Sequence, residues 1–196
     1  MAEGGLAATG RLPLLVGLGL LGMAALAGAA TWWHVRRKRA GSVPARLARV
    51  SQALLSGVLI PHVEGGHIHL QHVLLTRQGI LVVDLRDIVG HVFGSESMQE
   101  WTVLDRSHRS TFSNPLPALY DRMAAVRRLV PEVPVRGLVV FTPGADFSKG
   151  YPPNVAMLDG LLEELGSMAE SHDDPPADLL EGAWGRLARE AVSAGR

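Results

Sequence analysis

Residues 69–90 constrain the fold most, because they contain two apolar, β-branched runs on either side of a turn. Residues 73–75 precede the turn Thr76-Arg77-Gln78-Gly79, and residues 80–83 follow it. Short runs of this kind around a turn that contains glycine predict a β-hairpin. The second run is almost wholly apolar, which is typical of a central strand that is covered on both faces.

The remaining periodicity predicts a sheet flanked by helices. A short helix is expected over residues 45–55, because Leu47, Val50 and Leu54 would share one side of it. Asn114-Pro115 predicts the start of another helix, since Asn is a favoured N-cap and Pro a favoured first helical residue. Strands are expected at residues 58–60, 68–75, 80–84, 89–93, 101–104 and 137–141, and later helices at 157–170 and 177–192. This order indicates an α/β fold.

A long uncharged segment near the N-terminus predicts a membrane anchor. Residues 12–33 carry no charge over 22 positions, and as a helix they would span about 33 Å, against a hydrocarbon core of about 30 Å. Trp32-Trp33 ends this run, and the bases of residues 36–39 follow it, which predicts that the C-terminal part is cytoplasmic. The lipid bilayer is therefore an expected partner, and the inner (cytoplasmic) membrane of a bacterium the expected location, with a single pass.

A cleaved signal peptide is the alternative for this segment, with a processing site near residues 27–29. Its apolar run is longer than that of an ordinary signal peptide, and four bases just after a cleavage site would hinder export. The anchor is therefore preferred. It implies a short extracytoplasmic N-terminus (1–11), a transmembrane helix (12–34), a basic juxtamembrane linker (35–49), an α/β domain (50–171), and a linker with a C-terminal amphipathic helix (172–196).

Charge and composition narrow the functions of the α/β domain. After residue 50 there are 12 bases and 18 acids, a balance of about −6, which opposes a broad electrostatic contact with nucleic acid. A local basic groove remains open if the helix bases Arg122, Arg127 and Arg128 flank a site on the sheet. The absence of cysteine excludes disulfides, thiolate metal sites and cysteine nucleophiles.

Three polar residues mark the candidate site. Asp84 and Arg86 are two residues apart at the end of the predicted central strand, so their side chains point to one face. Gln71 lies on the partner strand. A simple solvated pair of Asp84 with Arg86 at the strand end is one interpretation of this pattern.

The region from about residue 50 to 144 resembles the nuclease-related domain (NERD) family. That resemblance implies a restriction-endonuclease-like mixed sheet flanked by helices, and it extends over nearly half the chain. It rests on an ordered set of segments: QHVLL at 71–75, GILVVDLRD at 79–87, Gly90, Trp101, NPL at 114–116, and the strand at 139–141.

The chain departs from the family at the positions that matter for chemistry. Members that keep the nuclease pattern have Asp-His on the first strand and Glu-x-Lys on the second. Here Gln71 replaces the first acid, and Asp84-x-Arg86 replaces the second motif. Ala118 stands where a glutamine is expected, and no acid occurs between residues 45 and 52.

These departures predict a degenerate site. Mg²⁺ prefers anionic oxygens, and a metal-activated water would attack the phosphate. Gln71 offers only a neutral oxygen, so Asp84 is at best a weak metal ligand. Arg86 can bind a phosphate through two hydrogen bonds but cannot act as a general base. No cofactor is certain, and Mg²⁺ is expected only if nuclease activity remains.

Three hypotheses follow from this reasoning. The first is a catalytically degenerate nuclease-fold module, held at the membrane, that binds DNA, RNA or another anionic partner. The second is an active, divergent Mg²⁺-dependent phosphodiesterase (nuclease) that uses Asp84 with Glu64 or Asp87 as the second acid. The third is a non-enzymatic membrane scaffold whose first and last helices gather partners.

The histidines raise a further alternative. Residues 67–72, HIHLQH, nearly match the HxHxDH zinc motif of the metallo-β-lactamase fold, with Gln71 in place of the acid. Two histidines at this spacing can bind one zinc ion. That fold needs more chain and further ligands, so we expect His67 and His69 to lie on an exposed strand face instead.

Overall fold

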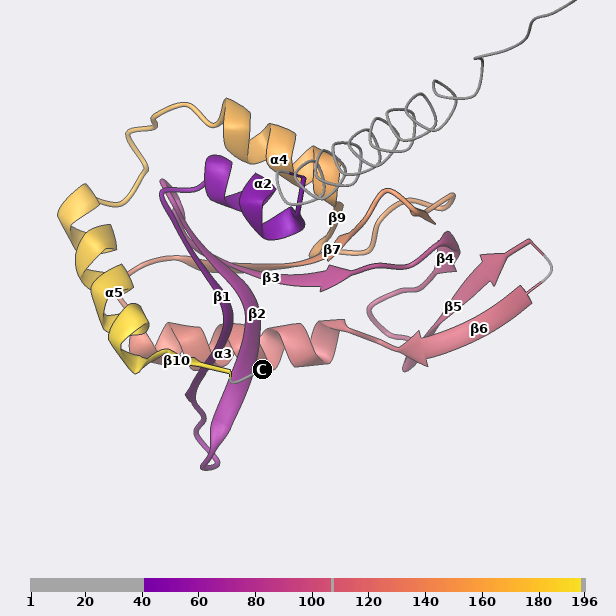
Figure 1. The fold of residues 1–196 in the computed structure, drawn as a ribbon, viewed down its shortest axis with the longest axis horizontal. Helices are drawn as coiled ribbons and strands as arrows, with labels where there is room; N and C mark the ends of the chain where they lie inside the picture. The colour runs from indigo at the N-terminus through magenta and orange to yellow at the C-terminus, as the bar shows by residue number, and fades with distance from the viewer. Residues whose placement is uncertain (1–40, 107, 195–196) are drawn as a thin grey trace, which may run out of the picture. The chain divides into compact units, whose positions relative to one another are not determined.

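The computed structural model describes residues 41–106 and 108–194. Its contacts divide the chain into residues 1–45 and residues 46–196, and the second unit is the one described below. The described residues form a mixed α/β fold with two mixed sheets (Figure 1). The helices are α2 (Val43–Arg49), α3 (Leu116–Leu129), α4 (Leu158–Ser167) and α5 (Ala177–Glu190).

The larger sheet contains the predicted hairpin at its centre. Its six strands have the order β10-β1-β2-β3-β7-β9. They are β1 (Ala53–Pro61), β2 (His67–Thr76), β3 (Gly79–Arg86), β7 (Val135–Phe141), β9 (Val155–Met157) and β10 (Val192–Ser193). Strands β2 and β3 are antiparallel and pair up to Thr76 and Gly79, so the hairpin and its turn are confirmed. Strand β7 is parallel to β3, which makes the sheet mixed.

The smaller sheet corrects one prediction. We expected residues 89–93 to continue the main sheet, but β4 (Gly90–Phe93) pairs instead with β5 (Glu100–Asp105) and β8 (Ala145–Asp146). Gly90 permits this change because its φ is +122°, and a Cβ there would lie 2.6 Å from the carbonyl oxygen of Leu104. Strand β6 (His108–Ser113) completes the order β6-β5-β4-β8 and was not predicted.

Helices cover both faces of β3. Helix α3 packs below the large sheet and α4 above it in the view of Figure 1. Residues Ile80 and Val82 of β3 belong to the same buried cluster as residues of α3 and α5. Leu81 and Val83, which point to the opposite face, are also buried. The prediction of an apolar central strand that is covered on both sides is therefore confirmed.

The short helix at the start of the domain is the second correction. We expected it to extend over residues 45–55, but α2 ends at Arg49 and β1 begins at Ala53. Residues Ala53 and Leu54 pair with Leu75 and Leu74 of β2. This pairing across the sheet satisfies the backbone and buries the apolar residues, so it overrides the helical spacing in the local sequence.

The predicted transmembrane helix, residues 12–34, lies outside the described residues. Among the helices that the structure does describe, none is both long and apolar enough to cross a bilayer.

The turn of the central hairpin gives a stability test. A Cβ on Gly79, whose φ is +126°, would overlap the carbonyl oxygen of Pro134. We expect Gly79→Ala to lower the free energy of unfolding by about 2 kcal/mol or more. Gly182→Ala is the control, because a Cβ in that part of α5 meets no atom within 4 Å. The control should stabilise the protein by about 0.5–1 kcal/mol. Urea denaturation followed by circular dichroism measures both changes.

Candidate functional site

The candidate site forms where β2, β3 and α3 meet. The antiparallel register pairs His72 with Val83, so the next position along places Gln71 opposite Asp84. Residues directly opposite each other in an antiparallel pair share a face. On β3, Asp84 follows Ile80 and Val82 at even spacing, so it points toward α3 with them.

Asp84 is a buried carboxylate with a partner on the helix. It is 3% exposed, and its Oδ2 accepts a hydrogen bond of 2.7 Å from Nη1 of Arg122. Arg122 also donates from Nε to the carbonyl oxygen of His69, at 2.8 Å. One guanidinium therefore joins α3 to both β2 and β3. The interpretation of Asp84 as part of a solvated strand end is wrong, because the carboxylate is buried and paired.

The electrostatics of Asp84 combine opposing effects. Burial raises the pKa of its carboxyl group, while the positive charges of Arg122 and Arg86 and the nearby His69 lower it. Burial is the largest of these causes, so the pKa lies above its ordinary value. The cations around Asp84 therefore offset only part of the cost of burying its ionised form.

The guanidinium group of Arg86 has hydrogen-bond donors that lack an acceptor among the described residues. Its Nε is buried and has no hydrogen-bond partner, and its guanidinium donates to no other group in the described part of the chain. The backbone at this point is fixed, since Thr142 donates from its amide to the carbonyl oxygen of Arg86 at 3.1 Å. Within residues 41–106 and 108–194, Arg86 is therefore a half-buried guanidinium on a fixed backbone, and no side chain or carbonyl there accepts a hydrogen bond from it.

The side chain of Gln71 already accepts a hydrogen bond from the neighbouring strand. Its Oε1 accepts a hydrogen bond of 2.6 Å from the amide of Leu85. This contact ties β2 to β3 beyond the last paired residues of the ladder, His72 and Val83. Gln71 thus acts as a link between strands, and the neutral oxygen that it could offer to a metal ion already accepts one hydrogen bond.

The residues present do not fit a divalent metal ion. Asp84 is the single carboxylate of this cluster, and two arginines lie beside it, so an approaching cation would meet a net positive charge. Glu64 lies exposed in the β1–β2 turn, and Asp87 accepts a hydrogen bond of 2.6 Å from Thr142 Oγ1. Among the residues that the structure describes, no three His, Cys, Asp or Glu side chains gather as a metal site.

The histidines do not converge. His67 and His69 are exposed on β2, as expected from the sequence. His72 is 6% exposed and its Nδ1 shares a hydrogen bond of 2.9 Å with Ser56 Oγ on β1. Burial, and then the charge of His69, lower the pKa of His72. The geometry therefore gives no support to the zinc motif.

Arg122 is the site residue whose role the sequence left open. The three bases of α3 differ in their contacts: Arg122 reaches Asp84, whereas Arg127 donates to the carbonyl oxygen of Val135 and Arg128 is exposed. The sequence contained one local indication of this role, namely the spacing of Arg122 from the preceding apolar residues of the helix. Arg122 follows the buried Leu119 by three residues, so it lies close to the buried side of the helix.

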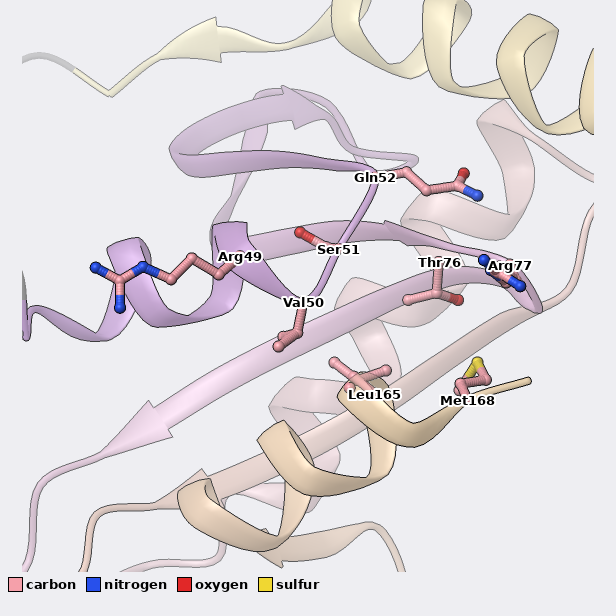
Figure 2. Close-up of a pocket in the computed structure, with 9 residues that line it drawn as sticks. Arg49, Val50, Ser51, Gln52, Thr76, Arg77, Leu165 and Met168 are labelled. Carbon is pink, nitrogen blue, oxygen red and sulfur yellow. The ribbon is translucent and has the colours of Figure 1, made fainter. Parts of the chain in front are cut away.

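A separate hollow lies at the other end of β3 and contains none of these residues. Its volume is about 250 Å³, and it lies beside the ends of α2 and α4 and the turn between β2 and β3 (Figure 2). Arg49 and Arg77 extend away from each other at its sides, and Arg77 pairs with Glu170 at 3.3 Å. The residues that line it include no carboxylate or imidazole, so it offers no acid–base chemistry.

The fold and the site agree with a family assignment. The family model for the nuclease-related domain (NERD) matches residues 37–142, more than half of the chain. The chain belongs to the nuclease-related domain family. Within that match lie all four residues of the site, namely Gln71, Asp84, Arg86 and Arg122.

One curated relative shows a weaker similarity. An uncharacterized protein of Bacillus anthracis is 26% identical over 94 residues, which cover 47% of this chain and 44% of that protein. The match thus spans less than half the length of that relative. No solved structure matches this chain.

The Arg122–Asp84 pair predicts a pH-dependent loss of stability. Arg122→Gln removes the largest charge that lowers the pKa of Asp84, so that pKa should rise further. At a pH well below the ordinary Asp pKa of about 3.9, the carboxyl group is protonated in the folded and unfolded states alike, and the pair contributes little. As pH rises through the raised pKa, the folded variant must ionise a buried carboxyl without its partner. We therefore expect a loss of about 2–3 kcal/mol in unfolding free energy at pH 7 and a smaller loss at pH 4.

Urea denaturation at the two pH values measures this difference. Arg128→Gln is the matched control, because Arg128 is an exposed base on the same helix. Its effect should stay within about 0.5 kcal/mol at both pH values. An equal loss for Arg122→Gln at pH 4 and pH 7 would show that the ion pair does not contribute to stability.

Proposed function

We propose that this nuclease-related domain protein binds the phosphate groups of nucleic acid without hydrolysing them. In this proposal the domain is a restriction-endonuclease-like module whose catalytic positions have become a binding site. The observation that carries the proposal is the Arg122–Asp84 ion pair, in which an internal cation takes the place that a metal ion would need.

The charges of the cluster support binding of an anion. Arg86 and Arg122 contribute two permanent positive charges, and Asp84 contributes one negative charge. Guanidinium groups match the geometry of phosphate oxygens and bind them through paired hydrogen bonds. Because the balance after residue 50 is about −6, such binding would depend on this local cluster and would weaken as salt increases.

The same residues argue against hydrolysis. Two-metal and one-metal phosphodiesterases need carboxylates to hold the ion that activates water. Gln71 has no charge and its oxygen is used by the amide of Leu85. Arg86 cannot give up a proton at physiological pH, so it cannot activate water directly.

The N-terminal sequence supports attachment to a membrane. The uncharged run of 22 residues and the bases that follow it favour a single-pass anchor with the domain on the cytoplasmic side. We propose the cytoplasmic membrane as the location on this basis.

The scaffold hypothesis receives less support from the last helix. Leu180, Ala183 and Leu187 of α5 are at most 3% exposed, and α5 contacts α3 and β1. The buried side of the helix is already packed against its own domain, so Leu179 and part of Trp184 are the large apolar side chains of α5 that stay exposed for a partner.

A cleavage assay tests the proposal. The purified full-length protein is incubated with labelled DNA and, in parallel, RNA, in the presence of Mg²⁺ or Mn²⁺. We expect no cleavage above the background of an Asp84→Ala variant, because a paired carboxylate cannot hold the ion. Binding of the same nucleic acids, measured by fluorescence anisotropy, should be unchanged by EDTA.

Metal-dependent cutting that Asp84→Ala abolishes would refute the proposal and establish the active nuclease instead. Failure of the wild-type protein and of all site variants to bind DNA or RNA at low salt would also refute it, and would leave the scaffold.

A further inference from the structure

The cluster around Asp84 has an excess of donors. Arg122 donates from Nη1 to Asp84 and from Nε to the carbonyl oxygen of His69, so its guanidinium group is held in place by both strands. Arg86 acts on Asp84 only through its charge and donates no hydrogen bond within the described residues. A buried N–H without an acceptor costs about 1–3 kcal/mol.

Asp84 itself is the anion that these cations now surround. A planar carboxylate and a tetrahedral phosphate each present two oxygens that one guanidinium can bind together. Arg122 donates a hydrogen bond of 2.7 Å to Asp84 Oδ2, as it would to a phosphate oxygen. The carboxylate is 3% exposed, so water screens its charge poorly.

We infer that Asp84 is an internal competitor for the phosphate of a bound nucleic acid, so that it lowers the affinity of the site formed by Arg86 and Arg122. This inference rests on the proposed function, since it requires that the cluster binds phosphodiesters. It assigns Asp84 a role opposite to that of a catalytic acid. Its removal strengthens binding, whereas removal of a metal ligand would abolish activity.

The geometry explains why competition is partial. Asp84 takes one donor of Arg122 and leaves the Nε of Arg86 without an acceptor. The side chain of Arg86 is half-buried, and its two terminal nitrogens are not among the buried unpartnered atoms, so a phosphate can bind to them while the ion pair stays intact. The remaining effect of Asp84 is repulsion between two negative charges at close range in a poorly screened environment.

The experiment compares isosteric variants of the full-length protein. Asp84→Asn removes the charge but keeps an oxygen that can accept from Arg122. Its affinity for a short fluorescein-labelled single-stranded DNA, measured by anisotropy at low salt, should be about tenfold tighter than that of the wild type. Arg86→Gln should bind about tenfold more weakly.

Asp121→Asn is the matched control. Asp121 precedes Arg122 on α3, is exposed, and undergoes the same change of charge. Its affinity should change by less than about twofold, since water and salt screen an exposed charge. Thermal unfolding verifies that each variant is folded, and Asp84→Ser serves as the second variant if Asp84→Asn is not.

The outcomes separate this inference from the proposed function. DNA binding by the wild type that is unchanged or weakened in Asp84→Asn and Asp84→Ser overturns the inference and leaves the proposed function standing. An equal gain in Asp84→Asn and Asp121→Asn also overturns it, because net charge alone would then explain the effect. Metal-dependent cleavage overturns the proposed function through the separate assay.

Discussion

The ion pair between Arg122 and Asp84 is the interaction on which the chemistry of this domain depends. A buried carboxylate is costly unless a charge and hydrogen bonds compensate it. Arg122 provides that compensation, and its second bond to the carbonyl oxygen of His69 connects the helix to the neighbouring strand. The same contact that positions α3 on the sheet therefore neutralises the one acid in the cluster.

The site lies where the buried apolar run of β3 ends. Ile80 and Val82 fill the core beneath the sheet, and Asp84 takes the next position on that face, close to the edge of the helix layer. Beyond it the strand continues to Arg86, whose Nε remains buried without a partner. A strand end next to a helix layer is partly shielded from water, so charges there interact more strongly than on the open surface. At this position the electrostatic interactions of Arg86 and Arg122 with Asp84 are therefore strong.

The sequence allowed the central hairpin to be predicted because its signals are local: the two apolar runs, their β-branched residues and the turn at Gly79 lie within a few residues of one another. Strand β6 had no such signal, since HRSTFS is polar and its pairing with β5 depends on the smaller sheet. The spacing of Leu47, Val50 and Leu54 suited a helix, but pairing of Leu54 with Leu74 made the last part a strand. Arg122 and Asp84 are 38 residues apart, so their contact depends on how α3 lies against the sheet, which no local pattern specifies.

Membership of the nuclease-related domain family and the chemistry of this site are separate questions, because one fold can carry different functions. The family model describes the backbone framework over residues 37–142, whereas metal binding depends on the charges at a few positions. At those positions Gln71 contributes no charge and bonds to the amide of Leu85, and Arg86 contributes a cation. Restoring one acid at position 71 would still leave two arginines beside Asp84, so a single substitution would not recreate a cation site. Each arginine of the cluster adds a positive charge beside the one aspartate. This local balance of charge, which the fold does not dictate, therefore separates the chemistry of the site from membership of the family.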